Sequence, residues 1–134
     1  MQIKLIPLQA HGDERGSLIA LEQDKNIPFP IKRVYYIFDT QEGVTRGFHA
    51  HKELKQVAIA VKGSCRFLLD DGKEKVSFLL DNAAQGLLIE SCIWREMSDF
   101  SEDCVLMVLA DNFYDESDYI RDYDEFLKTI KDKK

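Results

Sequence analysis

Two histidines separated by one residue, His49 and His51, constrain this chain more than any other feature of its sequence. On a β-strand, residues i and i+2 point to the same face, so both imidazoles would project into one space. Gly43 lies six residues before His49, and Gly63 lies twelve residues after His51. Glycines are typical of tight turns, so the whole pattern predicts a strand, a hairpin and a second strand rather than an isolated histidine pair.

Short runs of β-branched, aromatic and aliphatic residues, separated by glycine-bearing turns, recur from the N-terminus to about residue 110. Such spacing predicts an all-β sandwich or barrel. Residues 11–16 are expected to form a turn, and residues 23–32, with two prolines, an extended loop. The expected strands, besides the histidine stretch, cover residues 3–8, 17–22, 33–38, 56–61, 64–69, 76–80, 86–90, 92–97 and 104–109.

The hydrophobic period changes only near the C-terminus. Phe126, Leu127 and Ile130 recur at spacings of three and four within residues 123–133, which predicts an amphipathic helix. Acidic residues at its start and lysines at its end match the helix dipole. No repeat or linker interrupts the chain, so we expect one domain over residues 1–134, an all-β jelly-roll barrel with a short C-terminal α-helix.

Composition excludes several classes of protein. The net charge of −6 argues against a nucleic-acid or anionic-membrane surface. The sequence has no apolar run long enough for a membrane span, and its N-terminus does not resemble a signal peptide. Three scattered cysteines, Cys65, Cys92 and Cys104, fit free thiols in a reducing compartment better than a disulfide framework. We therefore expect a cytoplasmic protein.

The spacing Gly-x5-His-x-His-x4-Gln-x6-Gly resembles the first motif of the cupin barrels, which carries a glutamate where this chain has Gln56. A second cupin motif supplies a third histidine, and the best register places Trp94 there. Two neutral imidazoles and a neutral amide make a poor site for a divalent ion, so we expect no functional metal. Free of metal, a histidine can exchange protons near neutral pH. Trp94 is a candidate for stacking on a flat ligand, or for plain core packing.

The strand expected over residues 33–38 has two unlike faces. Val34, Tyr36 and Phe38 form the more apolar face and are expected to pack against the opposing sheet. Arg33 and Tyr35 form the other face, which suits a polar cavity. Tyr35 is thus a candidate for proton transfer, although a role as a packed aromatic residue stays open.

Three arginines, Arg15, Arg33 and Arg46, are candidate anion ligands, because a guanidinium binds phosphate in a bidentate fashion. Strict alternation puts Arg46 on the face opposite His49, unless a bulge at Gly47 re-aims it. The acidic residues before the helix are expected to form a solvated connection: Asp111, Asp115, Glu116 and Asp118.

Taken together, these stretches resemble one cupin family, the dTDP-4-keto-6-deoxyglucose 3,4-ketoisomerases, also called WxcM-like sugar ketoisomerases. The Arg-Gly-x-His core also resembles that of the dTDP-sugar 3,5-epimerases. One departure is Glu90-Ser91, where the family carries a Gly-Pro pair. The resemblance spans most of the chain and is carried by Lys32–Tyr36, Arg46–Lys52 with Gln56, Trp94–Met97 and Tyr114–Tyr123.

The resemblance implies a homodimeric cupin without a metal or other cofactor. It implies an isomerase that moves the ketone of dTDP-4-keto-6-deoxyglucose from C4 to C3 by acid/base tautomerisation, on the route to dTDP-3-amino-3,6-dideoxy sugars. A 3,5-epimerase-like cupin, a metal-dependent cupin enzyme and a non-catalytic sugar-nucleotide sensor stay open as alternatives. The implied roles are His49 as principal base, His51 and Tyr35 as helpers in proton movement, and Arg15 and Arg46 as substrate ligands. Apart from the resemblance, Arg33, Gln56 and Trp94 are further candidate contacts with substrate.

Overall fold

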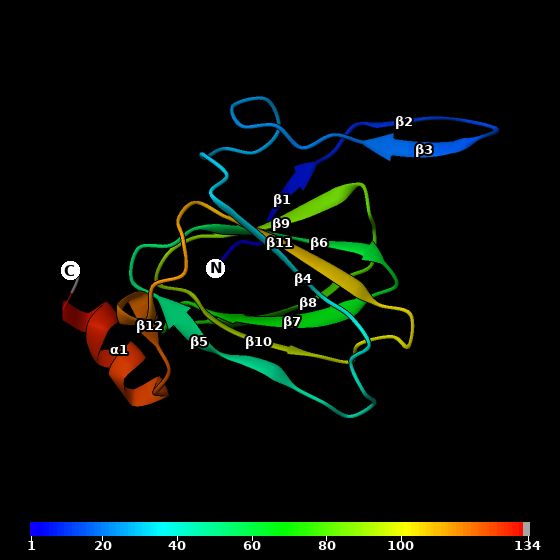
Figure 1. Cartoon of the computed structure of the whole chain (residues 1–134). Coiled ribbons are helices and arrows are strands. Elements are labelled where there is room, and N and C mark those ends of the chain that lie inside the picture. The colour runs from blue at the N-terminus through cyan, green and yellow to red at the C-terminus, as the bar shows by residue number, and fades with distance from the viewer. Residues whose placement is uncertain (133–134) are drawn as a thin grey trace.

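The computed structural model describes residues 1–132, in which two five-stranded sheets face each other (Figure 1). One sheet has the order β1 (Lys4–Pro7), β9 (Gln85–Ile89), β6 (Gln56–Lys62), β11 (Val105–Ala110) and β4 (Arg33–Ile37). The other has the order β12 (Tyr119–Ile120), β5 (Arg46–His51), β10 (Trp94–Ser98), β7 (Cys65–Asp70) and β8 (Lys75–Leu80). Outside the sheets lie a hairpin of β2 (Ala10–Asp13) and β3 (Gly16–Ile19), a 3₁₀ turn (Glu116–Asp118) and helix α1 (Tyr123–Asp132).

The predicted all-β fold with a C-terminal helix is confirmed, with one change of shape. No strand pairing joins the two sheets within the described residues, so the architecture is a two-layer jelly-roll sandwich rather than a closed barrel. The predicted helix extended to residue 133, which lies outside the described residues, and the single domain over residues 1–134 stays a prediction.

The core lies between the two sheets and is built by strand alternation. In β7, Cys65, Phe67 and Leu69 are buried, whereas Arg66 and Leu68 between them are partly exposed. Leucines of β8, β9 and β11 meet these side chains in one cluster. Fully burying a Leu or Phe side chain contributes about 1.5–3 kcal/mol, so this layer stabilises the scaffold that holds the histidines.

Strand β4 faces the opposite way from our expectation. The side chains of Val34, Tyr36 and Phe38 are 52%, 63% and 56% exposed, whereas Tyr35 packs against the inter-sheet core. The prediction that the apolar face meets the other sheet is wrong. It failed because an apolar face does not tell which neighbour covers it, and the second apolar cluster, which includes Leu8, Ile27 and Phe29, does not extend over these side chains.

The N-terminal region contains a hairpin where we expected a turn. Ala10 pairs with Ile19 and Asp13 with Gly16, so residues 11–16 contribute to two strands and the tight connection between them. This β2–β3 hairpin projects away from the two sheets (Figure 1). The sequence did not predict this hairpin, because every residue of β2 is exposed and the strand therefore has no alternation of apolar and polar residues.

Helix α1 covers the outer face of the second sheet, at the end of β5 that carries the histidines (Figure 1). Phe126 of the helix is fully buried in a cluster with Ala50, Trp94 and Ile120. Ala50 lies between the two histidines in sequence, so this packing fixes the strand from behind. No helix within residues 1–132 is long and apolar enough to cross a membrane.

Candidate active site

A bulge in β5 sets the direction of the histidine strand. Arg95 of β10 pairs with His49, but the next residue, Glu96, pairs with Gly47, so β5 carries one extra residue, Phe48. Gly47 has φ +94° and Phe48 has φ +57°. A Cβ atom on Gly47 would lie 2.9 Å from the Arg95 carbonyl oxygen, so this close approach requires glycine.

The bulge also re-aims Arg46, as the sequence pattern allowed. Arg46 pairs with Met97, and residues that lie opposite each other in an antiparallel ladder share a face. Met97 and Arg95 share one face of β10, and His49 lies opposite Arg95. Arg46 therefore belongs to the same sheet face as His49, although its own side chain is exposed.

The two imidazoles meet each other and one tyrosine. The rings of His49 and His51 are nearly perpendicular, with 5.0 Å between their centroids. The ring of Tyr119 lies 5.0 Å from that of His49 and 4.4 Å from that of His51. His51 is 1% exposed, whereas His49 is half-buried. The prediction that both imidazoles share one space is confirmed.

Asp118 determines how His51 is oriented. Its Oδ2 lies 3.2 Å from His51 Nδ1, and its two oxygens also accept hydrogen bonds from the backbone N–H groups of Glu53 and Leu54. A carboxylate that accepts from Nδ1 favours the tautomer with its proton on that nitrogen. Nε2 of His51 is then a free lone pair, and it is buried with no hydrogen-bond partner among residues 1–132.

Arg95 is the charged residue of the site that our sequence reasoning missed. It is 2% exposed, and its guanidinium donates hydrogen bonds to Gln56 Oε1 and, at 3.1 Å, to the carbonyl of Ile93. The sequence reasoning selected Trp94, one position earlier, and adjacent strand residues point to opposite faces. The pairing of Arg95 with His49 across the sheet brings this cation to the histidines.

Burial and this cation keep both imidazoles neutral. Burial, reinforced by the Arg95 charge, lowers the pKa of His49 from 6.5 to about 4. The same two causes, in the same order, lower the pKa of His51 to about 2, although the carboxylate of Asp118 acts in the opposite direction. Burial also lowers the pKa of Arg95 to about 10, which still leaves the guanidinium charged at neutral pH.

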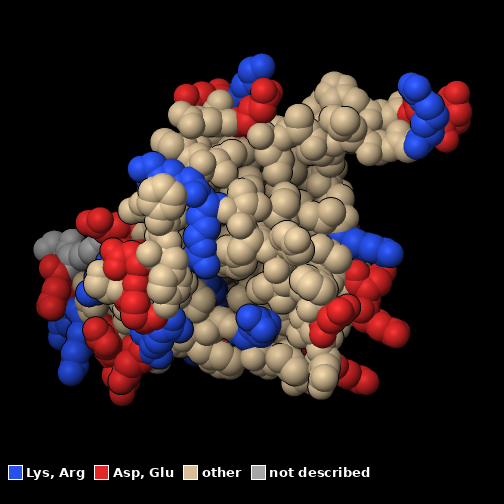
Figure 2. All heavy atoms as spheres, in the orientation of Figure 1, with Lys and Arg blue, Asp and Glu red and all other residues tan. Residues whose placement is uncertain are grey.

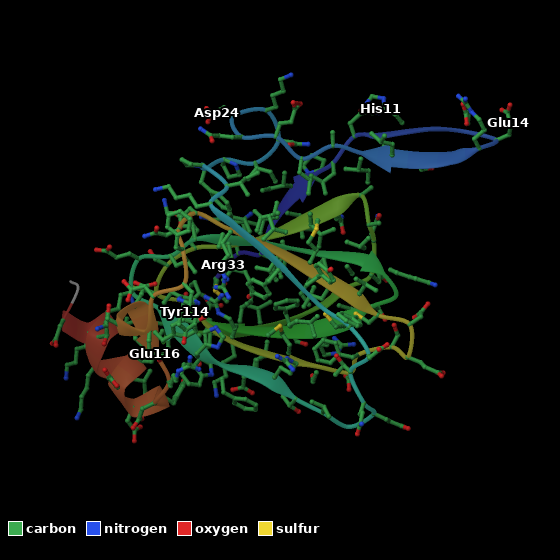
Figure 3. All side chains as sticks on the ribbon, in the orientation of Figure 1. His11, Glu14, Asp24, Arg33, Tyr114 and Glu116 are labelled. Atoms are coloured by element: carbon green, nitrogen blue, oxygen red, sulfur yellow. The ribbon has the colours of Figure 1, made fainter. Side chains whose placement is uncertain are left out.

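A cavity of about 300 Å³ opens beside the histidine pair. His51, Tyr119, Arg33 and Lys32 are among the residues that line it. In Figure 3, Arg33 points into the space between the sheets, with Tyr114 beside it. The Arg33 guanidinium lies 4.6 Å from the ring centroid of Tyr35 and 5.4 Å from that of Tyr114. The cavity therefore places the cationic side chains of Lys32 and Arg33 near the neutral imidazole of His51, and four acidic residues complete its charged lining: Glu53, Asp111, Asp115 and Asp118.

Tyr35 and Gln56 form a second polar group at the site. The side-chain amide of Gln56 donates to the hydroxyl of Tyr35 over 3.3 Å. Gln56 is 2% exposed, so it lies behind the site, whereas we expected it to contact substrate. Burial raises the pKa of Tyr35, so its hydroxyl stays protonated at neutral pH.

Two of the predicted substrate ligands lie away from the histidines in this chain. Trp94 faces helix α1, where its ring packs against Tyr123 and its N–H donates to Glu96. Arg15 lies on the projecting hairpin and pairs with Asp13 at 2.6 Å. Figure 3 places the neighbouring Glu14 far from Arg33. Trp94 is thus a core residue between sheet and helix.

The acidic stretch before α1 is not merely a solvated connection. Asp118 holds His51, and Asp111 accepts from the backbone N–H of Lys55. Arg121 lies over the Tyr119 ring at 4.2 Å and pairs with Glu116. The periodicity gave no signal for these contacts, and only the family resemblance of residues 114–123 pointed to this segment.

The donor set around the histidines does not resemble a metal site. Within residues 1–132, no three His, Cys, Asp or Glu side chains are grouped so that they could hold a metal ion. A buried guanidinium lies opposite His49, and a fixed positive charge there opposes the binding of a cation. Metal independence nevertheless stays a prediction to be tested by experiment.

Comparisons with known proteins identify the family of this chain. A model of the family described as FdtA, WxcM-like, C-terminal, matches residues 1–131. The TDP-4-oxo-6-deoxy-alpha-D-glucose-3,4-oxoisomerase of Aneurinibacillus thermoaerophilus is 56% identical over 130 residues, 97% of this chain and 94% of that protein.

Two solved structures share the whole fold. A 3,4-ketoisomerase from Helicobacter canadensis is 52% identical with a TM-score of 0.94, and the match covers 98% of each chain. A variant of the 3,4-ketoisomerase QdtA from Thermoanaerobacterium thermosaccharolyticum, solved in complex with TDP-4-keto-6-deoxyglucose, is 43% identical with a TM-score of 0.94. That match covers 97% of this chain and 94% of the other. This chain therefore belongs to the WxcM-like family.

Proposed function

We propose that this protein is an isomerase that moves the ketone of a TDP-linked 4-keto-6-deoxy sugar from C4 to C3. Family membership and the activities named for the relatives support this assignment. The observation that carries it is the pair of neutral imidazoles beside a buried cation, next to a cavity that Arg33 and His51 line. Two buried nitrogens without partners in the described chain, His51 Nε2 and Arg95 Nε, mark where sugar oxygens would bind.

The reaction needs only proton transfers. A ketone at C4 acidifies the hydrogen on C3, and a base removes it to give an enediolate shared by C3 and C4. The oxygen on C4 gains a proton and the oxygen on C3 loses one, while C4 receives a hydrogen. The product carries a ketone at C3 with no net oxidation or reduction. Such chemistry requires a base that is unprotonated at the working pH and hydrogen-bond donors at the developing oxyanion.

The residues divide between chemistry and binding. His49 is the principal base, because it is the imidazole that is only half-buried and lies opposite Arg95. His51 and Tyr35 relay protons to and from the sugar oxygens. Arg33 and Arg46 hold the diphosphate. Arg33 does so from the cavity wall, and Arg46 from the exposed end of the same sheet face as His49.

Replacing His49 by asparagine tests the base assignment. We expect His49→Asn to lower turnover by at least about 10²-fold, because general acid/base catalysis is typically worth about 10²–10⁴-fold, while TDP binding stays largely intact. Turnover is followed by NMR during incubation with TDP-4-keto-6-deoxyglucose in D2O, and TDP binding is followed by calorimetry. A near-normal rate for His49→Asn would remove His49 from this role.

The same NMR experiment on the unaltered protein separates the alternatives. A 3,4-ketoisomerase moves the ketone position, whereas a 3,5-epimerase exchanges deuterium at C3 and C5 and leaves the ketone at C4. A sensor that only binds the sugar nucleotide would produce neither change. Activity that disappears on chelation and returns with a divalent ion would identify a metal-dependent enzyme.

The pKa of His49 predicts the pH dependence of the reaction. The base works only when neutral, so activity is present above its pKa and is lost as the pH falls through it. Because that pKa is lowered to about 4, kcat/KM should stay flat from about pH 8 to about pH 6 and fall only toward pH 4. Arg95→Met, which removes a positive neighbour, should move this fall to higher pH. An acid limb near the ordinary value of about 6.5 in the unaltered enzyme would contradict the assignment.

We further propose a homodimer, built on the exposed outer face of β4. Val34, Tyr36 and Phe38 form an apolar row there, and Figure 2 shows few charged side chains at the centre of this face. The projecting β2–β3 hairpin would then carry Arg15 toward a second chain, so that Arg15 holds substrate across the interface. Free cysteines support the cytoplasm as the compartment of this dimer.

Light scattering tests the dimer. The unaltered protein should have twice the mass of one chain, and Tyr36→Lys should shift it toward the monomer by placing a charge on the covered face. Lys62→Ala changes an exposed residue outside the apolar row and serves as a control that should leave the mass unchanged. A monomeric unaltered protein at assay concentration would contradict the proposal.

A further inference from the structure

Gln56 connects three strands from both sheets. It begins β6 in the first sheet, and its side chain contacts Arg95 of β10 in the second sheet and Tyr35 of β4. At 2% exposure it has no access to solvent. A buried amide in this place can act on the reaction only through the two side chains that it contacts.

The chemistry of Arg95 decides which way the amide of Gln56 points. A guanidinium can only donate hydrogen bonds, so the atom that faces it must be the carbonyl oxygen, Oε1. The amide nitrogen then faces the other way and donates to the hydroxyl oxygen of Tyr35 over 3.3 Å. The orientation of the amide is thus fixed by a partner that cannot accept a hydrogen bond.

The hydroxyl oxygen of Tyr35 therefore accepts a hydrogen bond from Gln56, and its O–H group is available to donate to another partner. Within residues 1–132, the structure contains no acceptor for that proton. The tyrosine is partly exposed, and Arg33, which stacks on its ring, lines the cavity beside the histidines. Tyr35 therefore lies directly behind a residue of the cavity wall.

We propose that Gln56 is a positioning residue that keeps the Tyr35 O–H directed at the sugar oxygen that becomes negatively charged in the enediolate. This inference rests on the proposed ketoisomerase function. A glutamate at position 56 can only accept, so it would pair with Arg95 and also take the hydrogen bond of Tyr35. That exchange would remove the donor from the oxyanion and add a negative charge beside it.

Kinetic comparison of Gln56→Glu, Tyr35→Phe and the double variant tests the inference. Removing one oxyanion donor typically costs about 10²–10³-fold in kcat, so we expect each single variant to lose activity in this range, with little change in KM. The double variant should be slower than Tyr35→Phe by much less than the full effect of Gln56→Glu, because both changes remove the same hydrogen bond and only the added carboxylate remains as a separate cost. The proposal would be overturned if the fold-loss in kcat of the double variant equalled the product of the two single losses. A near-normal kcat in either single variant would also overturn it.

A spectroscopic readout separates this inference from the proposed function. With ¹³Cζ-labelled tyrosine, NMR titration gives the pKa of Tyr35 without any turnover, and Tyr35→Phe identifies its signal. Replacing the donor Gln56 by an acceptor should raise this pKa. An unchanged Tyr35 titration in Gln56→Glu overturns the positioning role even if the protein is an active isomerase. An inactive unaltered protein with the expected titration shift overturns the proposed function instead.

Discussion

The buried guanidinium of Arg95 is the constraint on which the rest of the site depends. Burying a cation away from water costs several kcal/mol of desolvation free energy. Hydrogen bonds and favourable electrostatic interactions with neighbouring groups must offset that cost. The side chain of Gln56 and the carbonyl of Ile93 accept hydrogen bonds from the two terminal nitrogens of Arg95. The Nε atom of Arg95 has no hydrogen-bond partner among residues 1–132. A charge held this way lies between the two sheets before any substrate arrives.

Three properties of the site follow from that charge. It adds to the larger effect of burial in lowering the pKa of both imidazoles, so His49 and His51 are neutral bases at neutral pH. It opposes a divalent ion at the position where cupin metal ligands would gather. It also fixes the amide of Gln56, which in turn leaves Tyr35 as a donor. Electrostatic preorganisation of this kind lowers the barrier because no group must reorient during the reaction.

Much of the fold could be predicted from the sequence, because strand alternation and turn glycines report local geometry. The shared face of the histidine pair came from spacing, and it is confirmed. The bulge at Gly47 was left open as an alternative to strict alternation, and the structure contains it. The face of β4 was misjudged, since apolarity indicates burial but does not say whether the same chain provides the cover. The β2–β3 hairpin was missed because its β2 strand is entirely exposed and has no alternation to detect.

The site was only partly predictable for a related reason. Arg95 has no motif of its own, and its role depends on a cross-sheet contact with Gln56 and a cross-strand contact with His49. Asp118 reaches His51 from a position 67 residues away in the sequence. Contacts between residues far apart in the sequence produce no local pattern that spacing could reveal. The spacing argument therefore selected Trp94 instead of its neighbour Arg95.

The most direct test of the central claim is the protonation state of the two imidazoles, measured by ¹⁵N NMR of labelled histidine between about pH 5 and pH 8. The account predicts that His49 and His51 stay neutral across this range, with His51 protonated on Nδ1 because of its contact with Asp118. Titration of both rings near the ordinary pKa of about 6.5 would contradict it, because it would mean that Arg95 and burial do not control the histidine pair.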